Sequence, residues 1–330
     1  MPSFQTAVPP LPQAWQGDRV DLDTPAGRVS LYCSVPAAEP GSRASTAPGP
    51  QGPPLLLVHS VNAAASAAEV APLFNHYRTK RPVYALELPG YGFSDRSDRV
   101  YSLRLMTDAV HAAVAWLHNK QGVCPIDVLA VSLACEFVAR VQCESPGTFR
   151  RMALVSPTGF RGAKLRYGPA GSSLGQPWLH RLLRWRFWTE GIFNGLTRPS
   201  VVRYFLQRTW GAKVIDEDLW RYCVLTARQP GARHAPLYFV SAFLFSNDVN
   251  TLYEALDIPV WVSMATRGDF TDYRGRATVE TKPNWQFHAV TGGALPYFED
   301  LSAFTRVLDP FWSSDKTNPA GEHAMPNPVC

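Results

Sequence analysis

Ser132 is the residue whose setting most directly suggests chemistry. It stands between Ala130 and Ala134, after the apolar run 126–131 and before a helical pattern over 135–141. A serine on a tight turn from a strand into a helix presents its hydroxyl as a nucleophile, and N–H groups at the helix start can stabilise an oxyanion. Only small side chains fit two places to either side of such a strained serine, and Ala130 and Ala134 stand there. The alternative is an ordinary buried turn whose serine only caps the helix.

Two other segments directly follow apolar runs and have an unusual composition. One reads Leu57-Val58-His59-Ser60-Val61, and the other reads Glu87-Leu88-Pro89-Gly90-Tyr91-Gly92-Phe93-Ser94-Asp95. Together with the turn at Ser132, they resemble three motifs of the α/β-hydrolases, in the same order and with the same spacing. These motifs are the G-x-S-x-G nucleophile elbow, a strand ending in His-Gly, and a D-x-P-G-x-G-x-S turn.

The resemblance covers residues 18–157 and 258–312 and is to the cap-bearing branch of that family. Both glycines of the elbow are alanine here, and Ser60 replaces the glycine after the strand histidine. The branch includes serine esterases and carbon–carbon bond hydrolases, and also enzymes with an aspartate nucleophile, from which Ser132 points away. The resemblance implies an oxyanion hole made by the N–H groups of Val61 and Leu133.

The family's catalytic acid follows the strand after the cap. In this chain the run 260–264 leads into a turn that contains Asp269 and Asp272. The resemblance implies Asp269 as the acid, with Asp272 as the second choice. Either residue could instead be an aspartate that only shapes a turn.

The family's catalytic histidine follows the last strand, in a segment like G-x-G-H-x-P-x-x-E. The matching segment here runs from Gly292 to Glu299 and places Ala294 at the histidine position. Without an imidazole, nothing obvious removes the proton of Ser132. No other histidine is a convincing replacement, and His234 is the first to consider. We therefore expect Ala294→His to raise esterase activity, and the two preceding glycines to leave room for the ring.

The elements that must position these residues alternate between strands and helices. A period of two over 18–36 predicts an antiparallel pair of strands. Continuous apolar runs, typical of parallel strands covered on both faces, follow at 55–58, 83–86, 126–131 and 152–155. The strand pattern resumes at 258–264 and again at 285–290. The clearest helix starts after Ser102, and a last amphipathic helix covers 301–312. This alternation predicts an α/β protein with a mostly parallel, doubly wound sheet.

The alternation is interrupted over residues 158–257, which we interpret as a helical cap inserted into a core of 18–157 and 258–312. The segment has 13 Lys and Arg against 7 Asp and Glu, and it holds half of the tryptophans. Residues 179–188 are amphipathic and basic. The cap could line an apolar pocket, hold an anionic group with an arginine, or touch a membrane surface. For most of the arginines we favour simple packing, with their charged ends in solvent.

Composition excludes several classes of protein. Hydrophobic residues are 46% and charged residues 18%, which excludes a disordered or fibrous chain, although the tail 313–330 is polar and predicted to be disordered. A net charge of +5 without a lysine run gives no reason to expect nucleic acid. We expect no membrane span and no signal peptide, and six scattered cysteines indicate reduced thiols in a cytoplasmic protein. No metal-ligand spacing or phosphate loop occurs, so we expect no metal and no cofactor.

The prediction from sequence is a hydrolase that cleaves an ester-type or related bond in a small apolar organic molecule through Ser132, with an incomplete triad. The alternative is a ligand-binding pseudoenzyme that keeps the capped pocket but has lost the chemistry. Fold alone does not choose between them.

Overall fold

The computed structural model describes residues 8–36, 52–185 and 189–314. Its sheet has the strand order β1-β2-β4-β3-β5-β6-β7-β8. β2 runs antiparallel to β1 and β4, and every other neighbouring pair is parallel. The strands are β1 Asp18–Thr24, β2 Gly27–Ser34, β3 Leu55–Val58, β4 Val83–Leu86, β5 Ile126–Val131, β6 Phe149–Val155, β7 Val260–Ala265 and β8 Trp285–Val290. The predicted mostly parallel α/β sheet is confirmed.

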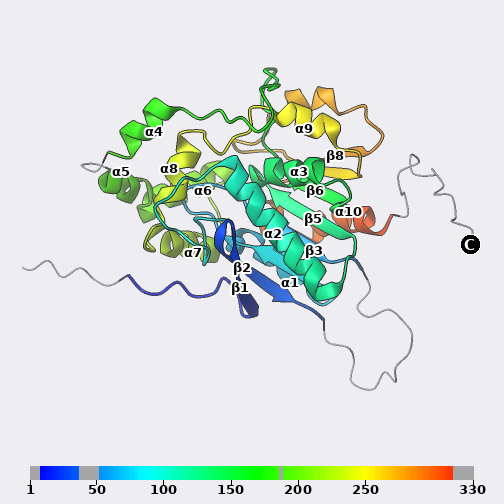
Figure 1. Ribbon diagram of the computed structural model, residues 1–330, viewed down its shortest axis with the longest axis horizontal. Coiled ribbons are helices and arrows are strands. Elements are labelled where there is room, and N and C mark those ends of the chain that lie inside the picture. Colours follow the sequence, from blue (N-terminus) through cyan, green and yellow to red (C-terminus); the bar gives the residue numbers. More distant parts are fainter. Residues whose placement is uncertain (1–7, 37–51, 186–188, 315–330) are drawn as a thin grey trace, which may run out of the picture.

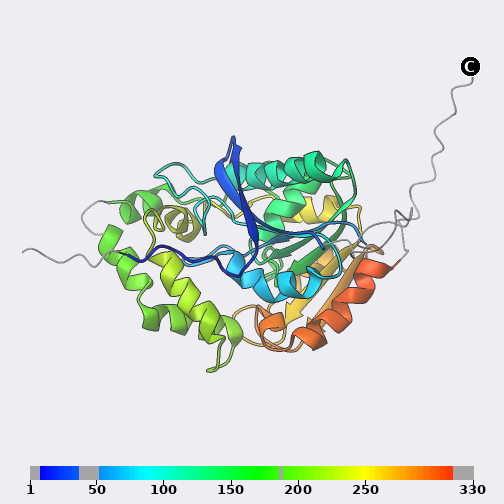
Figure 2. The same cartoon turned by 90° about the horizontal axis from the view of Figure 1, so that it is seen from below.

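Helices cover both faces of this sheet (Figures 1 and 2). One apolar core lies under α2 (Leu103–Gln121), α3 (Ala134–Glu144) and α9 (Val249–Ala255). The other lies under α1 (Ala71–Tyr77) and α10 (Leu301–Ser313). All four residues of β3 are fully buried, as expected of a strand covered on both faces. Short 3-10 helices occur as η1 Ala67–Val70, η2 Arg274–Thr278 and η3 Pro296–Phe298.

Local capping fixes where the two long amphipathic helices begin. The Ser102 hydroxyl accepts a hydrogen bond of 3.2 Å from the Leu105 N–H at the start of α2. Asp300 does the same for Ala303 at the start of α10, at 2.8 Å. A side-chain acceptor satisfies an N–H that has no partner within its own helix, so both helices start where the sequence predicts.

Among the described residues, six helices lie between β6 and β7. They are α4 Pro177–Leu183, α5 Thr189–Leu196, α6 Pro199–Trp210, α7 Glu217–Ala227, α8 His234–Val240 and α9. In Figure 1, α4 to α8 gather at one end of the sheet, whereas α9 lies beside α3. Because β6 and β7 are parallel neighbours, the chain must return along a face of the sheet, and α9 makes that crossover.

The gathered helices contact the turns that follow the parallel strands. Arg96, after β4, donates a hydrogen bond of 2.7 Å to the Thr226 carbonyl at the end of α7. Ala294, after β8, donates from its N–H to the Thr209 carbonyl of α6 at 3.0 Å. The inserted helices therefore lie over the carboxyl ends of the strands, where ligands bind in open α/β sheets. No helix among the described residues is long and apolar enough to span a membrane. Of the predicted disordered tail, residues 315–330 lie outside the described part.

Candidate active site

Ser132 occupies a strained turn between β5 and α3. Its φ of 55° lies in the left-handed region, which residues with a Cβ rarely adopt. Its N–H donates to the Val155 carbonyl of β6 at 2.8 Å, and this bond holds the turn against the sheet. Ala130 and Ala134, two places to either side, are fully buried. The predicted strand–turn–helix setting of Ser132 is present.

The two residues expected to supply an oxyanion hole leave neighbouring strands. β3 pairs with β5 so that Val58 lies opposite Ala130, and the chain therefore leaves both strands at the same edge of the sheet. Val61 and Leu133 are 3% and 1% exposed. Within the part of the chain that the structure describes, neither backbone N–H has an acceptor. Buried N–H groups without a protein acceptor are rare and point to water or a ligand.

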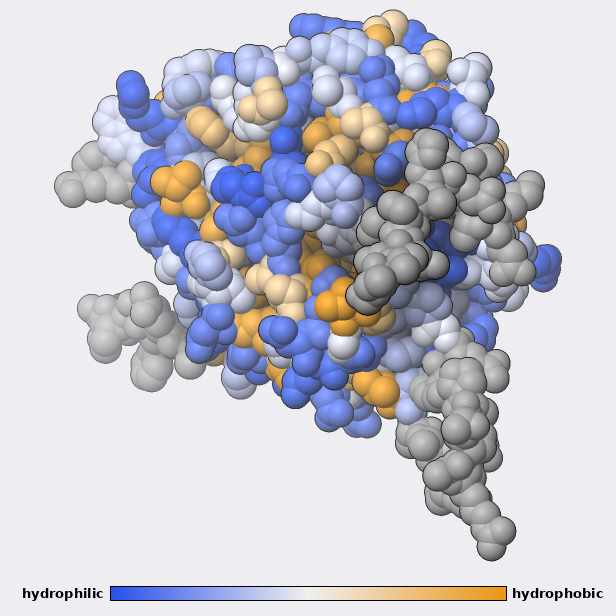
Figure 3. Space-filling model, turned by 45° about the vertical axis from the view of Figure 1, so that its right-hand side comes forward, coloured by the Kyte–Doolittle hydropathy of each residue, from blue (hydrophilic) through white to orange (hydrophobic). Residues whose placement is uncertain are grey.

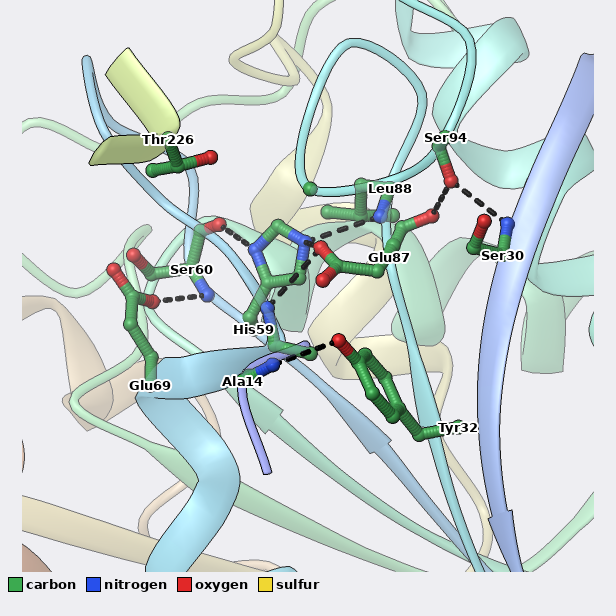
Figure 4. Close-up of polar contacts among 12 residues, drawn as sticks. Ala14, Ser30, Tyr32, His59, Ser60, Glu69, Glu87, Leu88, Ser94 and Thr226 are labelled. Atoms are coloured by element: carbon green, nitrogen blue, oxygen red, sulfur yellow. Dashed lines mark hydrogen bonds and ion pairs between the residues drawn. The ribbon is translucent and has the colours of Figure 1, made fainter. Parts of the chain in front are cut away.

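A buried carboxylate, Glu69, fixes the loop that contains Val61 (Figure 4). One Glu69 oxygen accepts from the Ser60 N–H at 2.9 Å, and the other accepts from the Asn62 amide at 2.8 Å. The Glu69 carbonyl accepts from the Tyr297 hydroxyl at 2.8 Å. Burial raises the pKa of the Glu69 carboxyl. Glu69 was not identified from the sequence, although a single acidic residue directly after the alanine-rich stretch 63–68 was an available signal.

His59 has both ring nitrogens committed to the backbone. Its Nε2 accepts from the Leu88 N–H at 3.0 Å, so Nδ1 carries the proton and donates to the Ser60 carbonyl at 2.6 Å. Burial lowers the pKa of His59 to about 4, so the ring is neutral near pH 7. Figure 4 shows the Glu87 carboxyl group facing this ring, with Oε2 3.7 Å from Nε2. A ring held in this way has no nitrogen left to take a proton from Ser132.

Burial of the Glu87 carboxyl group explains both its raised pKa and the need for glycine in the turn that follows it. Desolvation raises the pKa of Glu87 to about 7, and Ala67 donates a backbone N–H to its Oε2 at 3.2 Å. A Cβ at Gly92, where φ is 50°, would lie only 1.8 Å from the Glu87 carboxylate. The motif therefore needs glycine there because a buried side chain fills the space.

The two candidate acids bind arginine and backbone groups. Asp269 is exposed on 44% of its side chain and accepts from the Arg208 guanidinium of α6 at 2.9 Å. Asp272 accepts from the Gly162 N–H at 3.0 Å and from Arg274. Among the described residues, no histidine lies within hydrogen-bond reach of either carboxylate. In the described chain, neither aspartate is therefore paired with an imidazole.

The end of α6 occupies the neighbourhood of Ala294. Ala294 is 3% exposed, and its N–H donates to the Thr209 carbonyl at 3.0 Å. A Cβ at Gly293 would lie 2.4 Å from the Trp210 Cα. The Asp269 N–H likewise donates to an α6 carbonyl, that of Arg208, at 3.2 Å. Our expectation that the glycines leave room beside residue 294 is wrong, because the α6 backbone fills that space.

Other histidines have partners away from Ser132. His234, at the start of α8, has its Nδ1 3.5 Å from Asp98. His180 contacts Ser241 at 3.2 Å, and His288 stacks on Trp261 with 5.3 Å between ring centroids. In the described part of the chain, the Ser132 hydroxyl has no hydrogen-bond partner. Nor do any three His, Cys, Asp or Glu side chains of that part lie so that they could hold a metal ion.

A buried ionic network connects α3 to the chain that enters and leaves the inserted helices. Glu136 accepts from the Thr158 hydroxyl at 2.6 Å, the Ser246 N–H at 2.7 Å and the Arg166 guanidinium at 3.0 Å. One turn further along α3, Arg140 binds Asp248 through two hydrogen bonds, of 2.6 and 3.2 Å. This network fixes the helix that begins immediately after Ser132.

Comparison with known proteins shows the fold. No model of a protein family matches the sequence, and no curated protein matches it. A probable hydrolytic enzyme from Pseudomonas aeruginosa PAO1 is 16% identical with a TM-score of 0.66, over 91% of this chain and 95% of the other. An esterase from Thermogutta terrifontis is 16% identical with a TM-score of 0.64, over 89% and 98%. A meta-cleavage product hydrolase from Pseudomonas fluorescens is 15% identical with a TM-score of 0.62, over 88% and 96%.

These similarities extend over nearly the whole chain, in keeping with the mostly parallel sheet flanked by helices. The identities are too low to carry over an activity or a substrate. The protein has the α/β-hydrolase fold.

Proposed function

We propose that the protein hydrolyses an ester-type or related bond in a small apolar molecule through Ser132, slowly and without a histidine base. The observation that carries the proposal is the turn itself: a serine at φ 55°, at the sheet edge where two buried residues whose N–H groups have no acceptor in the described chain also follow their strands. Strained backbone persists where the surrounding fold enforces it, and such residues cluster at functional sites.

The chemistry follows from these groups. The Ser132 oxygen attacks the carbonyl carbon, the N–H groups of Val61 and Leu133 bind the oxyanion, and the alcohol leaves to give an acyl-enzyme that water hydrolyses. Because neither Asp269 nor Ala294 supplies a base, the serine proton passes to solvent. Serine proteases without their triad still exceed the uncatalysed rate by roughly 10³–10⁴, through the oxyanion hole and binding. We expect a rate enhancement on that scale.

A second candidate is a ligand binder without turnover, and one observation favours it. The α6 backbone is hydrogen-bonded to Asp269 and Ala294, the two positions where the family would place an acid and a histidine. A site closed in this way could keep the binding functions of the serine and the N–H groups without any catalysis.

Turnover of p-nitrophenyl esters by the native chain, Ser132→Ala and Ser145→Ala tests the proposal. Ser145 is exposed at the other end of α3, so its variant is the matched control. We expect slow turnover that Ser132→Ala abolishes and Ser145→Ala leaves unchanged. A phosphonate ester should label the native chain at Ser132, at a rate that follows the turnover. Turnover that survives Ser132→Ala contradicts the proposal, and saturable ester binding without turnover favours the binder.

A further inference from the structure

The carboxyl end of α6 docks on the two turns that follow β7 and β8. The N–H of Asp269, after β7, donates to the Arg208 carbonyl at 3.2 Å. The N–H of Ala294, after β8, donates to the Thr209 carbonyl at 3.0 Å. The last carbonyls of a helix have no partner within that helix, so these two turns cap α6. The end of an inserted helix is therefore held by the backbone of the core.

Glycines allow the α6 backbone to approach these turns so closely. A Cβ at Gly293 would lie 2.4 Å from the Trp210 Cα. A Cβ at Gly268 would lie 2.7 Å from the Thr209 carbonyl oxygen. Gly211, which follows α6 at φ 64°, would place a Cβ 2.4 Å from the Gly268 nitrogen. These overlaps are with backbone atoms, so no rotation of a side chain relieves them. The contact is a backbone fit between three segments that are far apart in the sequence.

The docked end of α6 is connected to the turn that contains Ser132. The Ala294 carbonyl, beside the N–H that binds α6, accepts from the Ser156 hydroxyl at 3.0 Å. The residue before Ser156, at the end of β6, accepts from the Ser132 N–H at 2.8 Å. Two hydrogen bonds and one peptide bond therefore connect the nucleophile turn to the turn on which α6 docks.

Apolar packing closes the same edge of the sheet. Val202 and Trp210 of α6 are buried, in the apolar core that also contains Val131, the last residue of β5. Ser132 directly follows and is only 9% exposed. On the face that Figure 3 presents, apolar residues form separate areas between polar ones, as expected where apolar side chains pack inward. The insertion is therefore packed down on the edge where Ser132 lies.

We propose that the docked end of α6 (Arg208, Thr209, Trp210 and Gly211) is an autoinhibitory gate that limits access to Ser132 until it leaves the two turns. Opening does not require the core to unfold, because the contacts described are two backbone hydrogen bonds, the exposed Arg208–Asp269 pair and the packing of Trp210 on Phe298. The inference concerns access and not bond cleavage, so it can fail or stand independently of the proposed hydrolysis.

Alkylation of a thiol at position 132 measures access without any ester turnover. Tandem mass spectrometry of Ser132→Cys treated with iodoacetamide separates this thiol from the native cysteines. Gly293→Ala should undock α6, because its Cβ would meet the Trp210 backbone. We expect Ser132→Cys with Gly293→Ala to react about tenfold faster or more than Ser132→Cys alone, since overpacking disfavours the docked state. The fully buried Cys135 should stay unreactive in both.

Gly195→Ala is the matched control, because a Cβ at Gly195 in α5 meets no atom within 4 Å. It should leave the alkylation rate of Ser132→Cys unchanged. Hydrogen exchange checks the undocking itself. In Gly293→Ala, peptides that contain Asp269 or Ala294 should exchange faster than in the native chain, because their N–H groups lose the α6 carbonyls.

Faster exchange at these turns without faster alkylation at position 132 overturns the proposal, because α6 would then move without opening the site. So does a thiol in Ser132→Cys alone that reacts as fast as the partly exposed Cys124. If Gly293→Ala does not fold or leaves exchange unchanged, Gly268→Ala tests the same contact from the other turn. Its control is Gly122→Ala, at a similar φ of 80° but with nothing within 4 Å. An unchanged alkylation rate in both docking variants also overturns the proposal.

Discussion

Glu87 and His59 are buried ionisable groups whose titrations act on stability in opposite directions. The pKa of Glu87 is raised from 4.5 to about 7, so the folded protein holds more protons than the unfolded chain between these values, and stability falls as pH rises through them. The pKa of His59 is lowered from 6.5 to about 4, so stability rises with pH between about 4 and 6.5. The two effects offset each other over most of this range.

Replacing Glu87 should therefore expose the effect of His59. We expect the stability of Glu87→Gln to increase as pH rises from 4 to 6.5. In the native chain, the effects of Glu87 and His59 on stability nearly cancel over this range. The stability of the native chain relative to the variant should fall, by on the order of 3 kcal/mol, between pH 4.5 and 7. Urea denaturation at a series of pH values measures this. Asp23→Asn, at an exposed carboxyl, is the control, and parallel profiles for native and Glu87→Gln would contradict the prediction.

Ala294→His is the substitution that the family resemblance suggests for restoring turnover. The structure adds a consequence, because residue 294 is buried against the end of α6. We expect the variant to lose about 1–3 kcal/mol, as overpacked sites do, and to raise esterase activity only if α6 moves. Thermal unfolding and p-nitrophenyl ester turnover measure the two effects. Ala294→Ser, which adds one atom, is the control, and an undisturbed stability of Ala294→His would show that the site has room.

Residues whose role depends on neighbours in sequence could be predicted, and residues whose role depends on distant partners could not. The turn at Ser132 follows from an apolar run, two alanines and a helical pattern, all within a few residues. The pairing of Asp269 with Arg208, 61 residues away, has no local signal. Nor does the burial of Glu69, which depends on how the loop after β3 folds over it.

At the scale of elements, the pair Arg140–Asp248 connects α3 to the loop before α9. Both residues are buried, at 6% and 4% exposure, and they share two hydrogen bonds. Asp248→Asn would leave a buried guanidinium without its counter-charge. We expect a loss of about 3–5 kcal/mol in urea denaturation. Glu217→Gln, which breaks an exposed pair with Arg203, should cost far less, because solvent screens that pair. Equal losses of stability in the two variants would show that burial does not increase the cost of breaking the Arg140–Asp248 pair.

The bounds of the strands were predicted to within about three residues, and those of the helices of the insertion were not predicted. The central strands β3 and β4 are continuous apolar runs and fully buried, because helices cover both faces of the sheet. Helices α4 and α8 have 7 residues each and no side-chain cap, so they carry neither a long periodic pattern nor a start signal. Their positions depend on packing over the carboxyl ends of the strands, which the sequence does not display.

At the scale of the whole molecule, the stability of the inserted segment should differ between its two parts. No residue of α4 is buried, whereas α9 packs on α3 and lies in the main core. Segments with few buried contacts open more readily than the global unfolding reaction. We expect the amides of α4 to exchange hydrogen much faster than those of α9, and α9 to exchange with α3. Mass spectrometry of peptides resolves these segments, and uniform exchange across them would contradict the prediction.

At position 132, the residue that would be best for stability is not the residue that the proposed activity needs. A left-handed φ on a serine costs roughly 1–3 kcal/mol, against a total folding stability of roughly 5–15 kcal/mol. Glycine adopts that φ without strain, so Ser132→Gly should raise the unfolding temperature while removing the hydroxyl. Ala242, with φ 64° in the insertion, offers the same gain through Ala242→Gly away from the site. Under the proposed function, Ser132→Gly should therefore gain stability and lose ester turnover, whereas Ala242→Gly should gain stability alone.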